Sequence, residues 1–157
     1  MNRSAPTDPR YPALLALLRA ADTVWNASHA LFARWDLSPS QFNVLNLLAD
    51  RPDGLTQSEL GRALIVHRSN VTGLVNRLAR RGLLARRKAA GDRRAWRVGL
   101  TPAGRQLWQE VHPHYRDAAV RVWGRLSARQ ARELARVLET LSVNAEALAR
   151  QIAASPA

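Results

Sequence analysis

The chain has 157 residues, which gives room for one compact domain or two closely packed lobes. Its 24 basic and 12 acidic residues give a formal net charge of +12 at pH 7, and such a field attracts polyanions such as DNA or RNA. Because the chain contains no cysteine, disulfides, thiolate metal sites and thiol-based redox sensing are excluded. No segment has the apolar pattern of a secretion signal or of a membrane span, so we expect a soluble cytoplasmic protein.

The first two predicted helices have clear start signals in the sequence. Asp8 followed by Pro9 is typical of an N-cap and a proline at the first helical position, and apolar residues then recur at helical spacing from Leu14 to Phe32. The sequence Ser-Pro-Ser-Gln at residues 38–41 predicts the capping box of a second helix. That helix is apolar nearly all round, so we expect it to be central and buried.

A third and a fourth helix follow a turn at residues 51–54. Thr56 and Glu59 predict another capping box, which starts a short helix that runs to about Leu64. Gly82 is placed to end the fourth helix. One face of the fourth helix is marked by apolar residues at helical spacing, which are Val71, Leu74, Val75 and Leu78.

The next segment changes to the period of a half-buried strand. Residues 96–100 alternate, residues 83–87 can pair with them, and residues 90–93 form the tip of the resulting β-hairpin. A two-stranded hairpin is only marginally stable alone, so it must lean on the neighbouring helices. Beyond it, Thr101 and Ser127 each predict the start of a long helix with one apolar face.

These elements predict a mainly α fold. Three helices and a β-hairpin wing form a winged helix-turn-helix lobe over residues 38–101, and residues 8–34 and 102–153 form a helical dimerisation lobe. The N- and C-terminal helices carry long apolar stripes. The simplest way to bury those stripes is against each other and against a second copy of the chain.

The basic residues are concentrated in one part of the chain. Residues 62–97 hold eleven of the 24 basic side chains and a single acid, Asp92. A run of charge is ordinarily a solvated face. Here the run coincides with the helix-turn-helix and the hairpin, and that combination favours binding of duplex DNA by residues 38–101.

Helical geometry selects the residues that face the DNA. The side opposite the apolar face of the fourth helix carries Ser69, Gly73, Asn76 and Arg80, with Thr72 and Arg77 on its flanks. Ser, Asn and Arg contact base edges in the major groove, and we expect the two arginines of the hairpin tip to enter the minor groove. The complete set expected to contact DNA is Arg68, Ser69, Asn70, Thr72, Gly73, Asn76, Arg77, Arg80, Arg86, Arg93 and Arg94.

These segments resemble the MarR family of winged-helix regulators. Residues 70–78 and 81–86 are similar to the family's recognition helix and following strand, and residues 92–104 to its wing and the start of its fifth helix. Residues 37–48 and 55–64 fit its second and third helices. The resemblance implies a homodimer whose two recognition helices meet successive major grooves of a pseudopalindromic operator. It also implies a repressor, and many members release DNA when they bind a small aromatic or phenolic anion.

The family's ligand pocket lies near the first, second and fifth helices. By position, the resemblance implies six residues that line this pocket, which are Trp25, His29, Asn43, Trp108, His112 and Tyr115. Each also has a structural interpretation, because tryptophans commonly fill a core and His29 is compatible with a core or interface histidine. Metal-sensing relatives use clustered histidines and acids such as Glu110, His112 and His114. However, the sequence His-Pro-His places its two rings on different sides of a helix, and we predict no metal and no cofactor.

The sequence leaves a transcriptional regulator, an architectural DNA-binding protein and an enzyme to be compared as classes of function. A ligand-responsive repressor is favoured, and a sequence-tolerant architectural DNA-binding protein or a metal-responsive regulator is the alternative. An enzyme is disfavoured because the sequence has no Walker loop, no nucleophile elbow and no zinc-ligand spacing. The ratio of affinities for specific and competitor DNA separates the repressor from the architectural protein.

Overall fold

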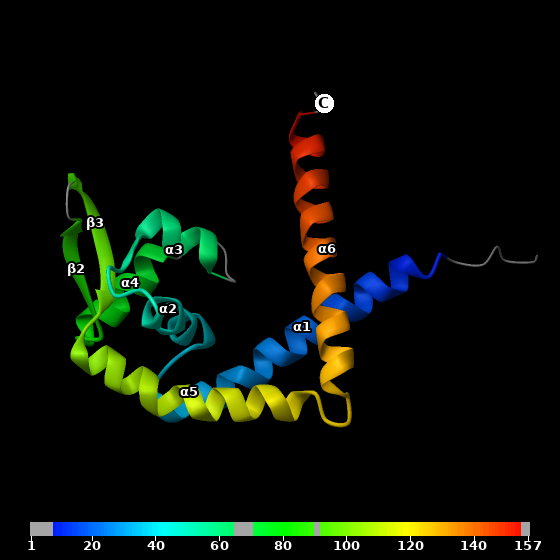
Figure 1. The fold of residues 1–157 in the computed structure, drawn as a ribbon, viewed down its shortest axis with the longest axis horizontal. Coiled ribbons are helices and arrows are strands. Elements are labelled where there is room, and N and C mark those ends of the chain that lie inside the picture. The colour runs from blue at the N-terminus through cyan, green and yellow to red at the C-terminus, as the bar shows by residue number, and fades with distance from the viewer. Residues whose placement is uncertain (1–7, 65–70, 90–91, 155–157) are drawn as a thin grey trace, which may run out of the picture. The chain divides into compact units, whose positions relative to one another are not determined.

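The structure, a computed structural model, describes residues 8–64, 71–89 and 92–154, with the side chains of residues 89 and 92–95 excepted. It is mainly helical with one small antiparallel sheet, as the sequence predicts (Figure 1). The chain divides into two compact units, residues 1–116 and residues 117–157. The described elements in chain order are α1 (Arg10–Phe32), the 3-10 turn η1 (Ala33–Trp35), α2 (Pro39–Ala49), β1 (Leu55–Thr56), α3 (Gln57–Ala63), α4 (Val71–Arg80), β2 (Leu84–Ala89), β3 (Asp92–Leu100), α5 (Pro102–Val122) and α6 (Ala128–Ala154).

Capping boxes start two of the helices where the sequence predicts them. The Ser38 hydroxyl accepts a hydrogen bond from the Gln41 backbone N–H, and the Gln41 side chain accepts one from the Ser38 N–H, so α2 begins after Ser38. Thr56 and Glu59 make the same reciprocal pair at the start of α3. The first helix differs by one residue, because it begins at Arg10 and its N-cap is Pro9 rather than Asp8.

Gly82 ends α4 and turns the chain into the sheet. Its φ of +71° is the left-handed conformation that glycine adopts without steric cost. The Gly82 N–H donates to the Ala79 carbonyl at 2.9 Å, and the Leu83 N–H donates to the Leu78 carbonyl at 3.0 Å. This pair of bonds is the Schellman end of a helix, and β2 therefore begins directly after α4.

The sheet has three strands in the order β1-β3-β2, all antiparallel. The sequence predicts β2 and β3 as a hairpin, although the strands extend further toward the tip than expected. It does not predict β1. In that strand Leu55 pairs with Val98 and Thr56 with Arg97, so β1 joins the start of α3 to the hairpin.

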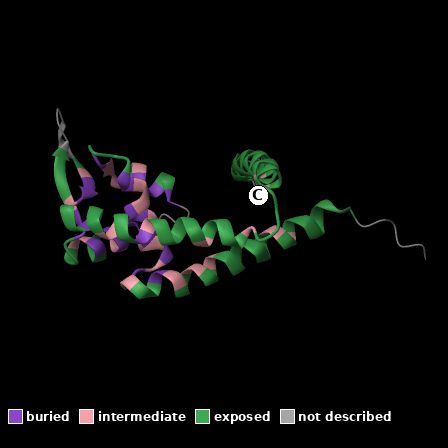
Figure 2. Cartoon of the chain, turned by 60° about the horizontal axis from the view of Figure 1, so that its bottom comes forward, coloured by how far each residue is buried: buried purple, intermediate pink, exposed green. Residues whose placement is uncertain are grey.

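The core lies entirely in the first unit, among α2, α3, α4 and the inner face of the sheet (Figure 2). The expectation that α2 is central is confirmed, because Val44, Leu45 and Leu48 are 0% exposed. The apolar face of α4 is buried as predicted. Phe32 from α1 and Val111 from α5 join the same core, so both helices are anchored to it.

Gly104 allows the start of α5 to lie directly against the chain that enters β2. A Cβ at this position would overlap the carbonyl oxygen of Leu83. We expect Gly104→Ala to lower the free energy of unfolding by about 1–3 kcal/mol, the usual cost of overpacking. Helix propensity alone would stabilise the variant by about 1 kcal/mol. Urea unfolding decides between the two, and a stabilised variant would contradict the close packing.

The second unit contains α6, whose residues are mostly exposed (Figure 2). Among the exposed side chains of α6 is an apolar stripe at helical spacing: Leu134, Val137, Leu141, Leu148 and Ile152. Within the part of the chain that the structure describes, no helix is both long and apolar enough to cross a membrane.

Candidate nucleic-acid interface

Helix α4 has one buried side and one polar side. Val71, Leu74, Val75 and Leu78 are at most 5% exposed and anchor the helix to the core. Thr72, Asn76, Arg77 and Arg80 are exposed, and Gly73 is half-buried. The division of the two faces is the one that helical periodicity predicts. The exposed face offers amide and guanidinium groups that a major groove can bind.

A hydrogen bond links α4 to the neighbouring strand. The guanidinium of Arg86 on β2 donates from Nη2 to Oδ1 of Asn76 at 2.7 Å. The sequence marks both residues as candidates for DNA contact but gives no sign of this pairing. The bond ties the strand of the wing to the exposed face of α4.

The inner face of the hairpin extends the basic surface beyond α4. Arg86 pairs with Val98 and Lys88 with Trp96, and residues directly opposite in an antiparallel pair share a face. Near the core this face is apolar, since Val98 is 1% exposed, whereas Trp96 is 52% exposed. The Lys88 ammonium lies 6.0 Å from the centre of the Trp96 ring, within the range of a cation–π contact.

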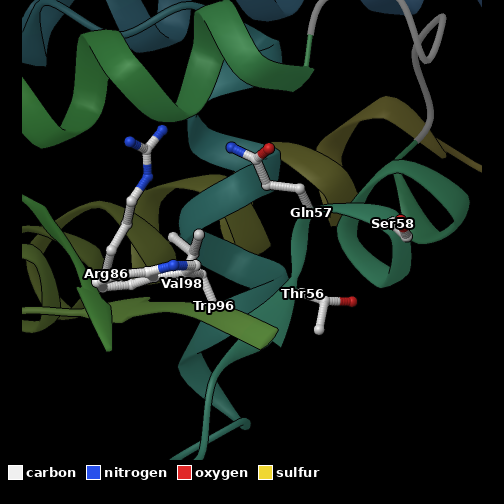
Figure 3. A pocket seen from close by; sticks show the side chains of 6 residues that line it. All are labelled: Thr56, Gln57, Ser58, Arg86, Trp96 and Val98. Carbon is white, nitrogen blue, oxygen red and sulfur yellow. The ribbon is translucent and has the colours of Figure 1, made fainter. Parts of the chain in front are cut away.

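A hollow of about 530 Å³ lies between the start of α3 and this face of the hairpin. Figure 3 shows the side chains of Arg86 and Gln57 directed to the same side, with Trp96 and Val98 on the strand below them. Gln57, Ser58 and Trp96 are not among the residues that the sequence suggests for DNA contact. Only the register of β3 with β1 and β2 brings them together.

Some of the basic residues make contacts within the protein that stabilise its fold. Arg81 donates to the Asp36 carbonyl and, at 3.2 Å, to the Trp35 carbonyl. Arg97 donates to the Gly54 carbonyl at 2.8 Å and lies 3.6 Å from the Glu59 carboxylate. These two arginines belong to the basic run of the sequence, and their contacts assign them structural roles.

Glu59 is a titratable residue of the α3 capping box. The backbone N–H of Thr56, and then its hydroxyl, donate to the Glu59 carboxylate and hold its pKa below the ordinary glutamate value, with attraction from Arg97 adding to the effect. A carboxyl whose pKa is lower in the folded chain contributes stability that is present above its unfolded pKa. That stability is lost as the pH falls through the folded pKa.

The contribution of the α3 capping box to stability should therefore depend on pH. We expect the urea midpoint of the wild type to exceed that of Glu59→Gln at about pH 6 and the difference to shrink as the pH falls from there through the lowered pKa of Glu59. Urea unfolding of both proteins across this range measures the effect. A difference that stayed constant or grew on acidification would contradict the lowered pKa of Glu59.

Five of the residues expected to contact DNA cannot be placed by their side chains. Arg68, Ser69 and Asn70 lie outside the described residues. Arg93 and Arg94 belong to β3, and their side chains are outside the described part of the chain. Their proposed contacts remain predictions, as do the contacts of the six residues that the structure does place.

The expected ligand-wall residues fall into separate groups of contacts. The Trp25 and His29 rings meet edge to face at 6.4 Å on α1, and the Trp108 and His112 rings stack at 4.7 Å on α5. Tyr115 packs against the buried rings of Phe32 and Phe42. The sixth residue, Asn43, has a buried side-chain nitrogen that lacks a hydrogen-bond partner. These contacts do not by themselves form one cavity, and the role of the six stays a prediction.

The three side chains considered as metal ligands, Glu110, His112 and His114, contact two different tryptophans. Glu110 accepts a hydrogen bond from the Trp35 indole N–H at 2.6 Å, and the His114 ring lies 5.2 Å from the Trp35 ring. His112 instead stacks on Trp108, whose indole N–H donates to Asn46 at 3.1 Å. This division agrees with the expectation that the two histidine rings lie on different sides of the helix.

Comparison with known proteins gives a consistent result. A family model described as MarR family matches residues 35–95. The homoprotocatechuate degradative operon repressor of Escherichia coli is 25% identical over 125 residues, which are 80% of this chain and 84% of the repressor.

Solved structures share the fold over nearly the whole chain. BpsR of Bordetella bronchiseptica, whose DNA binding is described as regulated by 6-hydroxynicotinic acid, has a TM-score of 0.77 at 26% identity and covers 88% of this chain and 98% of its own. A MarR family protein of Mycobacterium tuberculosis in complex with salicylic acid has a TM-score of 0.64 at 28% identity. That match covers 90% of this chain and 99% of the other.

Proposed function

Because the chain belongs to the MarR family of transcriptional regulators, we propose that it acts in the cytoplasm as a homodimeric repressor rather than as an enzyme. The dimer binds a pseudopalindromic site in duplex DNA, and a small aromatic acid releases it. This function requires a surface that contacts DNA, a surface that joins two chains, and a site that accepts the acid.

The polar side of α4 is the observation that carries the proposal. Its buried side fixes the helix on the core, while Asn76, Arg77 and Arg80 are left exposed beside the basic strand β2. A helix held in this way presents base-contacting and phosphate-contacting groups together, as a recognition helix does in the major groove. The proposed direct contacts are Arg68, Ser69, Asn70, Thr72, Gly73, Asn76, Arg77, Arg80, Arg93 and Arg94, and Arg86 supports them from β2.

The apolar stripe of α6 supports a homodimer. Leu134, Leu141 and Leu148 are 43%, 43% and 56% exposed in the single chain, and α1 adds Leu14 at 49% and Leu18 at 57%. Full burial of an exposed side chain of this kind contributes about 1.5–3 kcal/mol, and these residues, which are about half exposed, would gain roughly half of that amount each. We therefore assign residues 8–34 and 102–153 to dimerisation and residues 38–101 to DNA binding.

Two-fold symmetry then determines the form of the operator. A symmetric dimer presents two copies of α4, and these would meet successive major grooves about 34 Å apart. The two half-sites would be inverted copies of one another, because protein and DNA share the same axis.

A small aromatic acid is the proposed effector class. Two similar proteins support this class: 6-hydroxynicotinic acid regulates the DNA binding of BpsR, and the Mycobacterium tuberculosis protein forms a complex with salicylic acid. In this chain the buried, unpartnered amide nitrogen of Asn43 would donate a hydrogen bond to a carboxylate, and Trp25, His29, Trp108, His112 and Tyr115 supply aromatic surface. The acid can release DNA only if its affinities for the DNA-bound and free forms of the dimer differ.

A mobility-shift titration tests the proposed function. The protein is titrated against the DNA upstream of its own gene, with excess competitor DNA and at two salt concentrations. Binding that resists competitor and saturates at one dimer per site is expected, as is release by salicylate. Binding that competitor abolishes would favour a sequence-tolerant architectural protein instead.

A further inference from the structure

The amide of Asn76 has a fixed orientation in the structure. Arg86 Nη2 lies 2.7 Å from its side-chain oxygen. A guanidinium carries only hydrogen-bond donors, so the amide atom that faces it must be the oxygen and not the nitrogen. The Asn76 Nδ2 group, with its two donors, is therefore turned away from Arg86 on the exposed side of α4.

This orientation changes which base Asn76 can select. An asparagine that recognises adenine accepts a hydrogen bond from N6 and donates one to N7, so it uses both ends of its amide. Here one of the two lone pairs of the oxygen already accepts from a cation, and this bond turns the oxygen end of the amide toward β2. The remaining donors match base edges that present acceptors, and guanine presents two of them, N7 and O6, in the major groove.

We propose that Arg86 is a positioning residue that holds Asn76 as a hydrogen-bond donor, so that Asn76 selects guanine over adenine at one position in each half-site. The proposal rests on the proposed function, because it concerns the DNA contact of α4. It also changes the role that the sequence suggests for Arg86, from a direct contact with DNA to an action through Asn76.

The wing holds Arg86 in a defined place. On β2 Arg86 is opposite Val98, which is 1% exposed, and Trp96 and Gln57 line the same hollow (Figure 3). The strand register therefore fixes where the arginine stem begins, and the guanidinium reaches across to α4. A single exposed hydrogen bond contributes little to folding, so replacing Arg86 should change the orientation of Asn76 and leave the fold intact.

Selection from a random duplex library, followed by affinity measurements, tests the proposal. The wild type should prefer guanine over adenine at one position by about tenfold, and Arg86→Ala should remove that preference, because the freed amide can also pair with adenine. Asn76→Asp keeps a partner for Arg86 but has no donor, so it should lose the guanine preference as well. Arg87→Ala, on the next residue of β2 and the opposite face of the sheet, removes the same charge and should keep the preference.

The salt dependence separates positioning from direct contact. If Arg86 of each chain bound a phosphate, Arg86→Ala would reduce the slope of log affinity against log salt by about two units per dimer and leave the guanine preference unchanged, which would overturn the proposal. A wild type that prefers other bases but not guanine would overturn it too. A wild type with no base preference at all would instead contradict the proposed function itself.

Discussion

Leu141→Glu is expected to convert the dimer into monomers and to lower the affinity for operator DNA by at least about a hundredfold. Leu141 is 43% exposed in the middle of the α6 stripe. A carboxylate placed in an apolar interface loses hydration without gaining a partner, which costs several kcal/mol. A monomer holds one half-site only, so the gain that comes from linking two binding surfaces disappears.

Sedimentation velocity and a mobility shift measure these two effects. Val143→Glu is the matched control: Val143 is 64% exposed on the same helix, and two residues of helix rotate it about 200° away from Leu141. The control should remain dimeric and bind DNA normally. The core contains no residue of α6, so unfolding of the first unit should be unchanged in both variants. A Leu141→Glu protein that stayed dimeric would show that α6 does not join the two chains through this stripe.

Reversal of two charges on α4, by Arg77→Glu with Arg80→Glu, is the second large expected effect. Both side chains are exposed on the polar side of the helix. Each phosphate contact contributes about 0.9 unit to the salt slope, so loss of two contacts per chain, four per dimer, should flatten the slope by about 3.6 units. Repulsion between the new carboxylates and the phosphates should lower the affinity at low salt by about a hundredfold or more.

The control for this variant has the same net charge. Arg132→Glu with Arg136→Glu makes the same reversal on α6, on the side away from the apolar stripe. Titration of both double variants against one operator at several salt concentrations compares them. If the two lost affinity equally, the effect would come from the total charge of the protein, and α4 would not be the surface that contacts DNA.

The sequence predicts those features of the fold that depend on neighbouring residues. Ser38, Thr56 and Ser127 each make the capping contact with the residue three positions ahead that their sequence indicates. Gly82 ends α4 for the same local reason, since only its own backbone conformation is involved. The two faces of α4 follow from helical period alone.

The remaining features depend on contacts between residues far apart in the chain. Strand β1 is two residues long and exists because Leu55 and Thr56 pair with β3, which no local pattern indicates. The bond between Arg86 and Asn76 requires the hairpin to fold back beside α4. Likewise, the sequence places Arg81 and Arg97 in the basic run that is expected to face DNA. In the structure both donate hydrogen bonds to backbone carbonyl groups of distant residues of the same chain.

A hydroxyl-radical footprint on the tightest selected duplex tests the central claim, that two copies of α4 bind inverted half-sites of one operator. The predicted result is a pair of protected regions related by a two-fold axis, with centres about 34 Å, or one helical turn, apart. Both regions should disappear together in Leu141→Glu. A single protected region, or protection spread evenly along the duplex, would contradict a dimer that recognises a specific site.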